Sequence, residues 1–266
     1  MDANRLHWDG VVPMHAASAF YDVEGFKAGA TALHDIELRE LGDVSSRTML
    51  HLQCHFGLDT LSWRRAGATV TGVDFSGEAI AVARRLSAET GLDARFIEAN
   101  VYDLPDVLHE TFDIVFASYG VLCWLPDLAR WAQVISRFLV PGGRFYLAES
   151  TNVADMLEED ESGQLRLMPH YPTGTEPLSA MGPDYTDADV TVTTPTYEWD
   201  HTVAEVVTAL AAAGLIVEWV HEHPVLASKR FRSMTLGTDG WWRLTPPHDR
   251  LPLTFSIMAA RADHGS

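Results

Sequence analysis

Residues 47–76 read Arg-Thr-Met-Leu-His-Leu-Gln-Cys-His-Phe-Gly-Leu-Asp-Thr-Leu-Ser-Trp-Arg-Arg-Ala-Gly-Ala-Thr-Val-Thr-Gly-Val-Asp-Phe-Ser, and this stretch decides the fold. Its apolar run at 49–52 predicts a short buried parallel strand. A helical pattern follows Gly57 and ends at Gly67. A second strand then ends on Asp74, and Ser76 is placed to cap the next helix.

The acid at the end of the second strand points to the class of ligand. Asp74 follows Gly57 by 74 − 57 = 17 residues, which leaves room for one crossover helix and half a strand. A strand–turn–helix–strand unit of this kind suits a nucleoside, because its turn lets backbone groups approach the ligand closely. The carboxylate then accepts hydrogen bonds from two ribose hydroxyls.

The quoted stretch resembles the first two motifs of class I S-adenosylmethionine (SAM) methyltransferases. Those usually read Asp-x-Gly-x-Gly-x-Gly at the tip of the first strand. His51, Gln53 and His55 replace the acid and two glycines, and Gly57 remains. The variant His-Leu-Gln-Cys-His-Phe-Gly-Leu-Asp-Thr-Leu, followed by Thr-Gly-Val-Asp-Phe-Ser, is similar to a bacterial branch of this family, with the resemblance running from about Trp8 to the C-terminus.

The resemblance implies an α/β, Rossmann-like fold with the seven-stranded sheet of class I methyltransferases. It also implies an N-terminal helical cap and a flap inserted after the fifth strand. We therefore expect one domain over residues 1–266, made of a cap (1–46), a SAM-binding core (47–150), a substrate flap (151–199) and a C-terminal helix with strands (200–266).

The remaining elements follow from local signals. Helices are expected over 32–41, 128–139 and 200–213, the last stopped by Gly214. Strands are expected at 94–97, 114–116, 144–148, 215–220 and 251–260, with the final two joining as the antiparallel addition typical of the family. A turn is expected at Pro105, and Pro141-Gly142-Gly143 is expected to end the helix before it. Period-two patterns in 151–199 predict a hairpin or flap.

The cofactor implied by the resemblance is SAM, and the family pattern assigns residues to it. In the family the third strand ends in an acid or amide that binds the adenine amino group, and the next backbone amide meets a ring nitrogen. Asn100 and Val101 hold these positions, and an amide side chain can both accept and donate. The expected cofactor-binding residues are His51, Gln53, Gly57, Thr60, Asp74, Phe75, Ser76, Asn100, Val101 and Ser118.

The substrate side is expected to be aromatic, because in small-molecule methyltransferases aromatics before the first strand often fold over the cofactor; covering the sheet edge is the alternative. The expected substrate residues are Trp8, Tyr21, Tyr119, Trp124 and Tyr171. His201 is the candidate general base or substrate anchor, with a capping or packing role as the alternative. His221 and His223 form a His-x-His pair with no evident further ligand, so we expect no metal.

Composition limits the function classes. The 266 residues are 47% hydrophobic and carry a net charge of −18, which repels nucleic-acid phosphate and anionic membranes. No apolar run suits a membrane span or signal peptide, and the two cysteines, Cys54 and Cys123, fit a reducing compartment. We therefore expect a cytoplasmic protein with a small-molecule substrate, no nucleic-acid or membrane partner, and a possible homodimer.

The leading functional hypothesis is a SAM-dependent methyltransferase that acts on nitrogen or oxygen of a small molecule by in-line displacement. A nicotinamide-dependent oxidoreductase shares the acid after the second strand, but Gln53 and His55 would obstruct its pyrophosphate. A non-catalytic SAM-binding protein is the third possibility, motivated by the degraded glycine motif.

Overall fold

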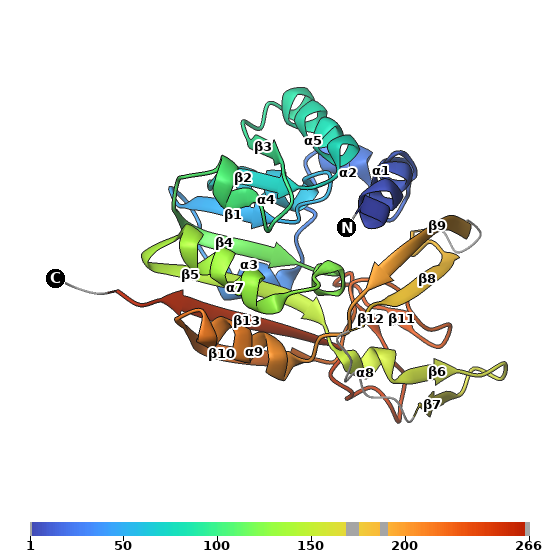
Figure 1. The fold of residues 1–266 in the computed structure, drawn as a ribbon. Coiled ribbons are helices and arrows are strands. Elements are labelled where there is room, and N and C mark those ends of the chain that lie inside the picture. The colour runs from blue at the N-terminus through green and yellow to red at the C-terminus, as the bar shows by residue number, and fades with distance from the viewer. Residues whose placement is uncertain (1, 169–175, 187–190, 264–266) are drawn as a thin grey trace.

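The computed structural model describes residues 2–168, 176–186 and 191–263, and its centre is a seven-stranded sheet. The strand order is β10-β13-β5-β4-β1-β2-β3 (Figure 1). The strands are β1 Thr48–Leu52, β2 Thr69–Asp74, β3 Arg95–Glu98, β4 Phe112–Ser118, β5 Leu139–Ser150, β10 Leu215–His223 and β13 Thr254–Arg261. Strands β1 to β5 are parallel, and β13 runs antiparallel to both β5 and β10. The predicted Rossmann-like sheet and its antiparallel addition are confirmed.

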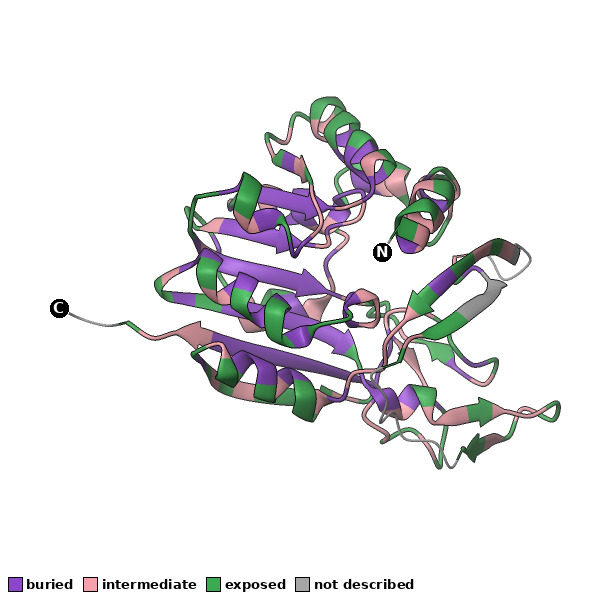
Figure 2. Cartoon of the chain, in the orientation of Figure 1, coloured by how far each residue is buried: buried purple, intermediate pink, exposed green. Residues whose placement is uncertain are grey.

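Helices cover both faces of this sheet, so the inner strands β1, β2, β4 and β13 are mostly buried, whereas the edge strands β3 and β10 are largely not (Figure 2). One face carries α3 Asp35–Leu41, α4 Leu58–Arg65 and α5 Gly77–Thr90, and the other α6 Leu104–Val107, α7 Leu128–Phe138 and α9 Val203–Ala212. Successive side chains of β1 point to opposite faces: Leu50 packs in the cluster of Trp131, and Met49 in that of Trp63. Truncating either fully buried tryptophan to alanine would cost about 3–5 kcal/mol.

Side-chain caps fix where the helices begin. Ser76 Oγ accepts a hydrogen bond from the Ala79 amide at 3.1 Å, which confirms the predicted cap of α5. Thr202 and Glu205 form a capping box that starts α9 at Val203, three residues later than the sequence suggested.

Several local predictions are wrong in detail. A turn was predicted at Pro105, but this residue lies at the start of helix α6. A proline is tolerated there, because the backbone N–H that it lacks would have no partner within the helix. The helix before Pro141 already ends at Phe138, so the Pro-Gly-Gly triplet lies within β5, where the pairing with β4 shifts register. The last strand begins at Thr254 instead of residue 251, and β10 extends to His223.

Several segments lie beyond the carboxyl ends of the strands and cover this edge of the sheet; together we call them the roof. It contains α1 Asp2–Ala17, α2 Val23–Lys27, the 3₁₀ turn η1 Leu122–Trp124, α8 Asn152–Asp155 and three antiparallel pairs: β6 Leu157–Glu159 with β7 Leu165–Leu167, β8 Leu178–Pro183 with β9 Thr191–Glu198, and β11 Thr235–Leu236 with β12 Trp242–Arg243. Helix α1 confirms the predicted N-terminal helical cap, although no bounds had been predicted for this helix. Asn4 of α1 joins β9 through two hydrogen bonds, Nδ2 to the Tyr197 carbonyl at 2.7 Å and the Tyr197 amide to Oδ1 at 2.8 Å.

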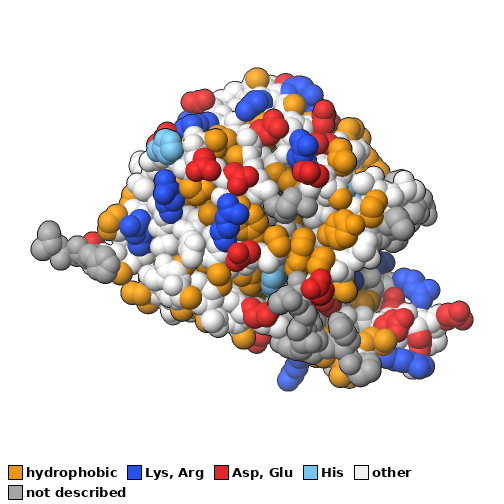
Figure 3. All heavy atoms as spheres, viewed as in Figure 1, with side chains coloured by type: hydrophobic (Ala, Val, Ile, Leu, Met, Phe, Trp, Pro, Cys, Tyr) orange, Lys and Arg blue, Asp and Glu red, His pale blue; other side chains and the backbone are white. Residues whose placement is uncertain are grey.

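Among the described residues, none of the helices combines the length and apolar character needed to cross a membrane. On the face shown in Figure 3, basic and acidic side chains are interspersed.

Candidate active site

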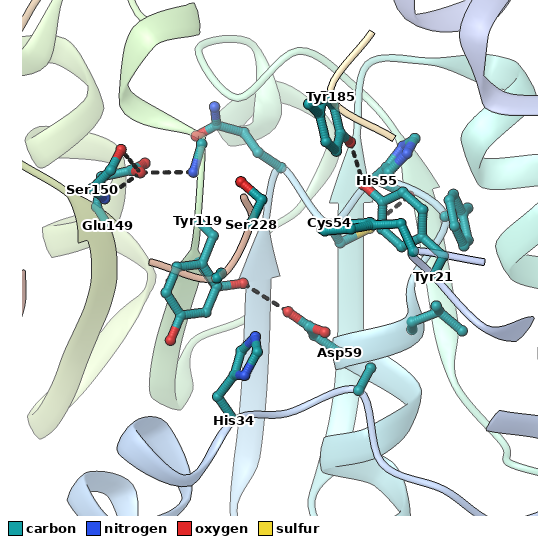
Figure 4. A pocket seen from close by; sticks show the side chains of 18 of the residues that line it. Tyr21, His34, Cys54, His55, Asp59, Tyr119, Glu149, Ser150, Tyr185 and Ser228 are labelled. Atoms are coloured by element: carbon teal, nitrogen blue, oxygen red, sulfur yellow. Dashed lines mark hydrogen bonds between the residues drawn. The ribbon is translucent and has the colours of Figure 1, made fainter. Parts of the chain in front are cut away.

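A cavity of about 850 Å³ lies where β1, β4 and β5 end. Two segments of the roof, α1 and the β8–β9 hairpin, cover it. Its walls are unusually rich in aromatic rings and carboxylates. Figure 4 shows Tyr21, Cys54, His55 and Tyr185 on one side of the cavity, with Asp59, His34 and Tyr119 facing them.

The loop after β1 keeps the backbone of a glycine-rich turn with only one glycine. Gln53, His55 and Gly57 have φ angles of 54°, 50° and 80°, so alternate residues are left-handed. This conformation costs about 1–2 kcal/mol for each residue that has a Cβ. No residue with a Cβ fits at position 57 without a shift of its neighbours, because the Cβ would lie 2.7 Å from Phe96 Cε1.

The side chains of Gln53 and His55 tie the loop to its neighbours. Gln53 Nε2 donates to the Val121 carbonyl at 2.9 Å, while its buried Oε1 has no partner among the described residues. His55 packs edge-on against Trp8 with ring centroids 5.1 Å apart, and its Nε2 lies 3.2 Å from His15 Nδ1. Burial lowers the pKa of His55 to about 3, so this ring is neutral at physiological pH.

Asp74 links the loop to the tip of β2. Its Oδ2 accepts from the His55 amide at 2.8 Å and its Oδ1 from the Ser76 amide at 2.9 Å. Burial raises the pKa of Asp74 to about 6, and these amide bonds oppose the rise. The carboxylate therefore holds the loop in shape at the tip of β2, and its contact with a ribose stays a prediction.

Asp74 belongs to a second cavity of about 30 Å³, whose lining includes Phe75, Asn100 and Val101. Gln53 and Trp124 line both cavities and so stand at their boundary. A space of this size holds about one water molecule. The predicted nucleoside subsite is therefore assembled but nearly closed, and its remaining lining residues are Asn4, Val73, Ala99 and Leu125.

The floor of the large cavity carries an acid and a neutral base. Asp59, in the first turn of α4, accepts from Ser118 Oγ at 2.9 Å, and burial raises its pKa to about 6. His51 of β1 hydrogen-bonds through Nδ1 to Thr60 Oγ1 at 2.8 Å. Burial lowers the pKa of His51 to about 3, and its Nε2 has no partner in the described part of the chain.

Glu149, at the end of β5, shapes the wall opposite. Its two oxygens accept from the amides of Gly120, Val121 and Leu122 at 2.7–3.2 Å. Glu149 was not among the predicted site residues, although an acid directly after a predicted core strand was the available signal.

A buried histidine, which was also not predicted as a site residue, joins α1 to the residue that follows β8. His15 of α1 is fully buried, and its Nε2 donates to Asp184 Oδ2 at 2.9 Å. Tyr21 and Tyr185 join their hydroxyls beside this pair. His15 and Asp184 are 169 residues apart, so no local pattern could have paired them.

The structure gathers most of the predicted site residues at these two cavities. The large cavity is lined by Trp8, Tyr21, His51, Gln53, Gly57, Ser118, Tyr119 and Trp124. Thr60 lies behind His51, and Ser76 caps α5 while its Oγ donates to Asp9 Oδ1 at 2.7 Å. His201 lines neither cavity, and its Nε2 donates to the Leu125 carbonyl at 2.6 Å. Tyr171 lies outside the described residues.

Two smaller expectations concern metals and thiols. Within 2–168, 176–186 and 191–263, no group of three or more His, Cys, Asp or Glu residues could hold a metal ion. His221 pairs instead with Glu40, Nδ1 to Oε1 at 2.8 Å. Cys54 and Cys123 are free thiols.

Comparisons with known proteins agree with this architecture. Residues 50–147 match the family model described as "Methyltransferase domain". The chain is similar to ubiquinone biosynthesis O-methyltransferases of Serratia proteamaculans (29% identical over 140 residues, covering 50% of this chain and 56% of the relative) and Alkalilimnicola ehrlichii (32% over 135 residues, 48% and 53%). The chain thus spans about half the length of the curated relatives it matches.

Solved structures share the fold across nearly the whole chain. The methyltransferase CcbJ from Streptomyces caelestis aligns with a TM-score of 0.59 at 18% identity, covering 90% of each chain. The glycopeptide N-methyltransferase MtfA, solved with SAM, aligns with a TM-score of 0.55 at 17% identity, covering 92% of this chain and 95% of its own. Residues 50–147 are thus similar to a methyltransferase domain, and the chain as a whole shares the fold of SAM-dependent methyltransferases of known structure.

Proposed function

We propose that this protein transfers a methyl group from SAM to nitrogen or oxygen of a small-molecule acceptor by in-line displacement. The observation that carries the proposal is the left-handed conformation at Gln53, His55 and Gly57, joined to Asp74 through the His55 amide. This backbone lets a ligand approach the end of β1 closely, with an acid at the adjacent strand tip.

The residues present fit the cofactor. The carboxylate of Asp74 would hold the ribose hydroxyls, and Asn100 with the Val101 amide would hold the adenine edge. The orphaned Oε1 of Gln53 stands at the boundary of the two cavities and is an unused acceptor for a donor group of the cofactor. SAM supplies an activated methyl on a sulfonium, so the protein need not supply a metal or a covalent nucleophile.

The role of the protein is then to position the acceptor and to exclude water. The large cavity has space for a drug-sized acceptor beside the strand tips, and α1 with the β8–β9 hairpin covers it. Curated relatives are O-methyltransferases and one structural neighbour is an N-methyltransferase, which leaves both acceptor atoms within the proposal.

Binding of SAM and of its demethylated product, measured by isothermal titration, tests this function. We expect both to bind, and Asp74→Asn to weaken binding about tenfold or more, because a hydrogen bond to a charged group contributes about 1.5–3 kcal/mol. Asp93→Asn, at an exposed position outside both cavities, is the matched control. If neither SAM nor its demethylated product gives measurable heat, and NAD raises the melting temperature, the assignment changes to an oxidoreductase.

A further inference from the structure

The large cavity has a charge pattern that narrows the choice of acceptor. Among the residues that the structure describes, no Lys or Arg lines it, although the chain contains 19 of them. Five carboxylate side chains do line it: Asp22, Asp59, Glu149, Asp184 and Glu198. Basic side chains are instead found on the outer surface (Figure 3). We propose that the methyl acceptor is a cationic amine and that Asp59 is its counter-ion; this proposal rests on the proposed function.

Three histidines of the wall do not restore positive charge. Burial lowers the pKa of His34, His51 and His55, the last two to about 3, so these rings are neutral at physiological pH. Arg65 contacts the wall from behind and is not itself a lining residue: its guanidinium lies 4.2 Å from the ring centroid of Phe26 and donates to the carbonyls of Phe26 and Ala30. An anionic acceptor would therefore meet acids without a compensating cation.

Among Asp59, Glu149 and Asp184, Asp59 is the carboxylate best placed to receive a ligand. Glu149 is already engaged by backbone amides, and Asp184 by His15 and Thr186. Asp59 accepts one hydrogen bond, from Ser118 to Oδ2, and its Oδ1 has no hydrogen bond within the described ranges. Because an ionised carboxylate removed from water is unstable without a partner, a bound cation would offset this cost.

A second feature of the floor indicates a missing ligand group independently of the acids. His51 is 2% exposed and lines the cavity, yet its Nε2 has no partner in the described residues. Buried polar atoms are rarely left without a hydrogen bond. The neighbouring walls offer ring faces that attract ammonium groups, with Trp8 and Trp124 packed edge to face at 5.3 Å.

An ammonium has no lone pair, so it must lose a proton before transfer. The Asp59 carboxylate takes this proton from R–NH₃⁺, which gives the neutral acid and R–NH₂. The nitrogen lone pair then forms the bond to the methyl carbon as the carbon–sulfur bond breaks, and the electron pair of that bond stays on sulfur. The product R–NH₂CH₃⁺ is again a cation, and Asp59 returns its proton to water.

Three probes of similar shape and different charge test the inference: 2-phenylethylammonium, 2-phenylethanol and phenylacetate. Their affinities are measured by titration against the wild type and Asp59→Asn, with and without the demethylated cofactor. We expect the ammonium to bind the wild type at least tenfold more tightly than the alcohol, and phenylacetate to bind most weakly. In Asp59→Asn the preference should fall below threefold. Asn can still accept from Ser118, so the variant should fold, and Asp93→Asn should retain the wild-type preference.

Equal or tighter binding of the alcohol or the carboxylate by the wild type overturns the inference. So does an ammonium preference that survives in Asp59→Asn, including the case in which this variant loses only cofactor affinity. The probes are measured without cofactor as well, so a failure to bind SAM would count against the proposed function alone. Turnover of amines with methyl-labelled SAM should be lost in Asp59→Asn, and turnover of alcohols but not amines by the wild type would also contradict the inference.

Discussion

The backbone amide of His55 donates to Asp74 Oδ2 at 2.8 Å, so the loop after β1 and the tip of β2 form one unit. The same carboxylate accepts from the Ser76 amide and thereby orients the start of α5. The residue predicted to hold a ribose is therefore also a structural residue. Changes in the loop should consequently affect folding and binding together.

Gly57→Ala should destabilise the protein by about 2–5 kcal/mol, from the left-handed backbone together with overpacking. Its φ is +80°, and an added Cβ would lie 2.7 Å from Phe96 Cε1. Gly91→Ala is the matched control, because Gly91 has φ +66° and open space around it. Urea denaturation of both variants isolates the steric contribution, and equal losses would show that Phe96 moves aside freely.

Asp59→Asn should stabilise the ligand-free protein at pH 8 by about 1–3 kcal/mol and have little effect at pH 3.5. Burial raises the folded-state pKa of Asp59 to about 6, above its value in the unfolded chain. The folded state therefore binds the proton more tightly, and stability falls as pH rises between about 4 and 6. Denaturant midpoints at the two pH values measure this, and an equal effect at both would refute the assigned shift.

Glu149→Gln should cost about 1–3 kcal/mol, because the new amide donors would face backbone donors in a buried site. Glu149 accepts from the amides of Gly120, Val121 and Leu122, and a glutamine has only one accepting oxygen. Glu158→Gln, at an exposed position, should be neutral. A stability of Glu149→Gln equal to that of the control would mean that the turn rearranges.

Opening of α1 should accompany cofactor binding, because the cavity at Asp74 holds about 30 Å³ and Asn4 lines it. Asn4→Ala removes both hydrogen bonds to Tyr197 and should accelerate hydrogen exchange in α1. Arg5→Ala, on the same helix and at an exposed position, serves as the control. Because α1 opens when SAM binds, exchange across α1 should be faster in the SAM-bound wild type than in the free protein, and unchanged exchange on binding would contradict this opening.

Local signals in the sequence were enough for the sheet and for several residues at its carboxyl edge. Local patterns predicted the strand at 48–52, the acid at Asp74 and the cap at Ser76, because each of these features depends on residues that are close in the chain. Positive φ at Gln53 and His55 could not be predicted, because it is uncommon for residues other than glycine, although histidine adopts it more often than most.

Contacts between distant segments account for what was missed. Helix α1 has a weak apolar face, and it is held by partners such as Asp184 and Tyr197 that lie more than 160 residues away. His201 had neighbours that suggested a catalytic group, but its ring turns to the Leu125 carbonyl. Asp59 was interpreted only as a helix start, because sequence alone does not show that Ser118 and the cavity lie above it.

The alternating left-handed residues at 53, 55 and 57 have a consequence for how such proteins are found. What the loop requires is a backbone handedness, and this can be met without three glycines when the side chains have somewhere to go. Searches that count glycines would discard chains of this kind. Each replaced glycine also gives evolution an extra side chain beside the ligand with which to tune selectivity.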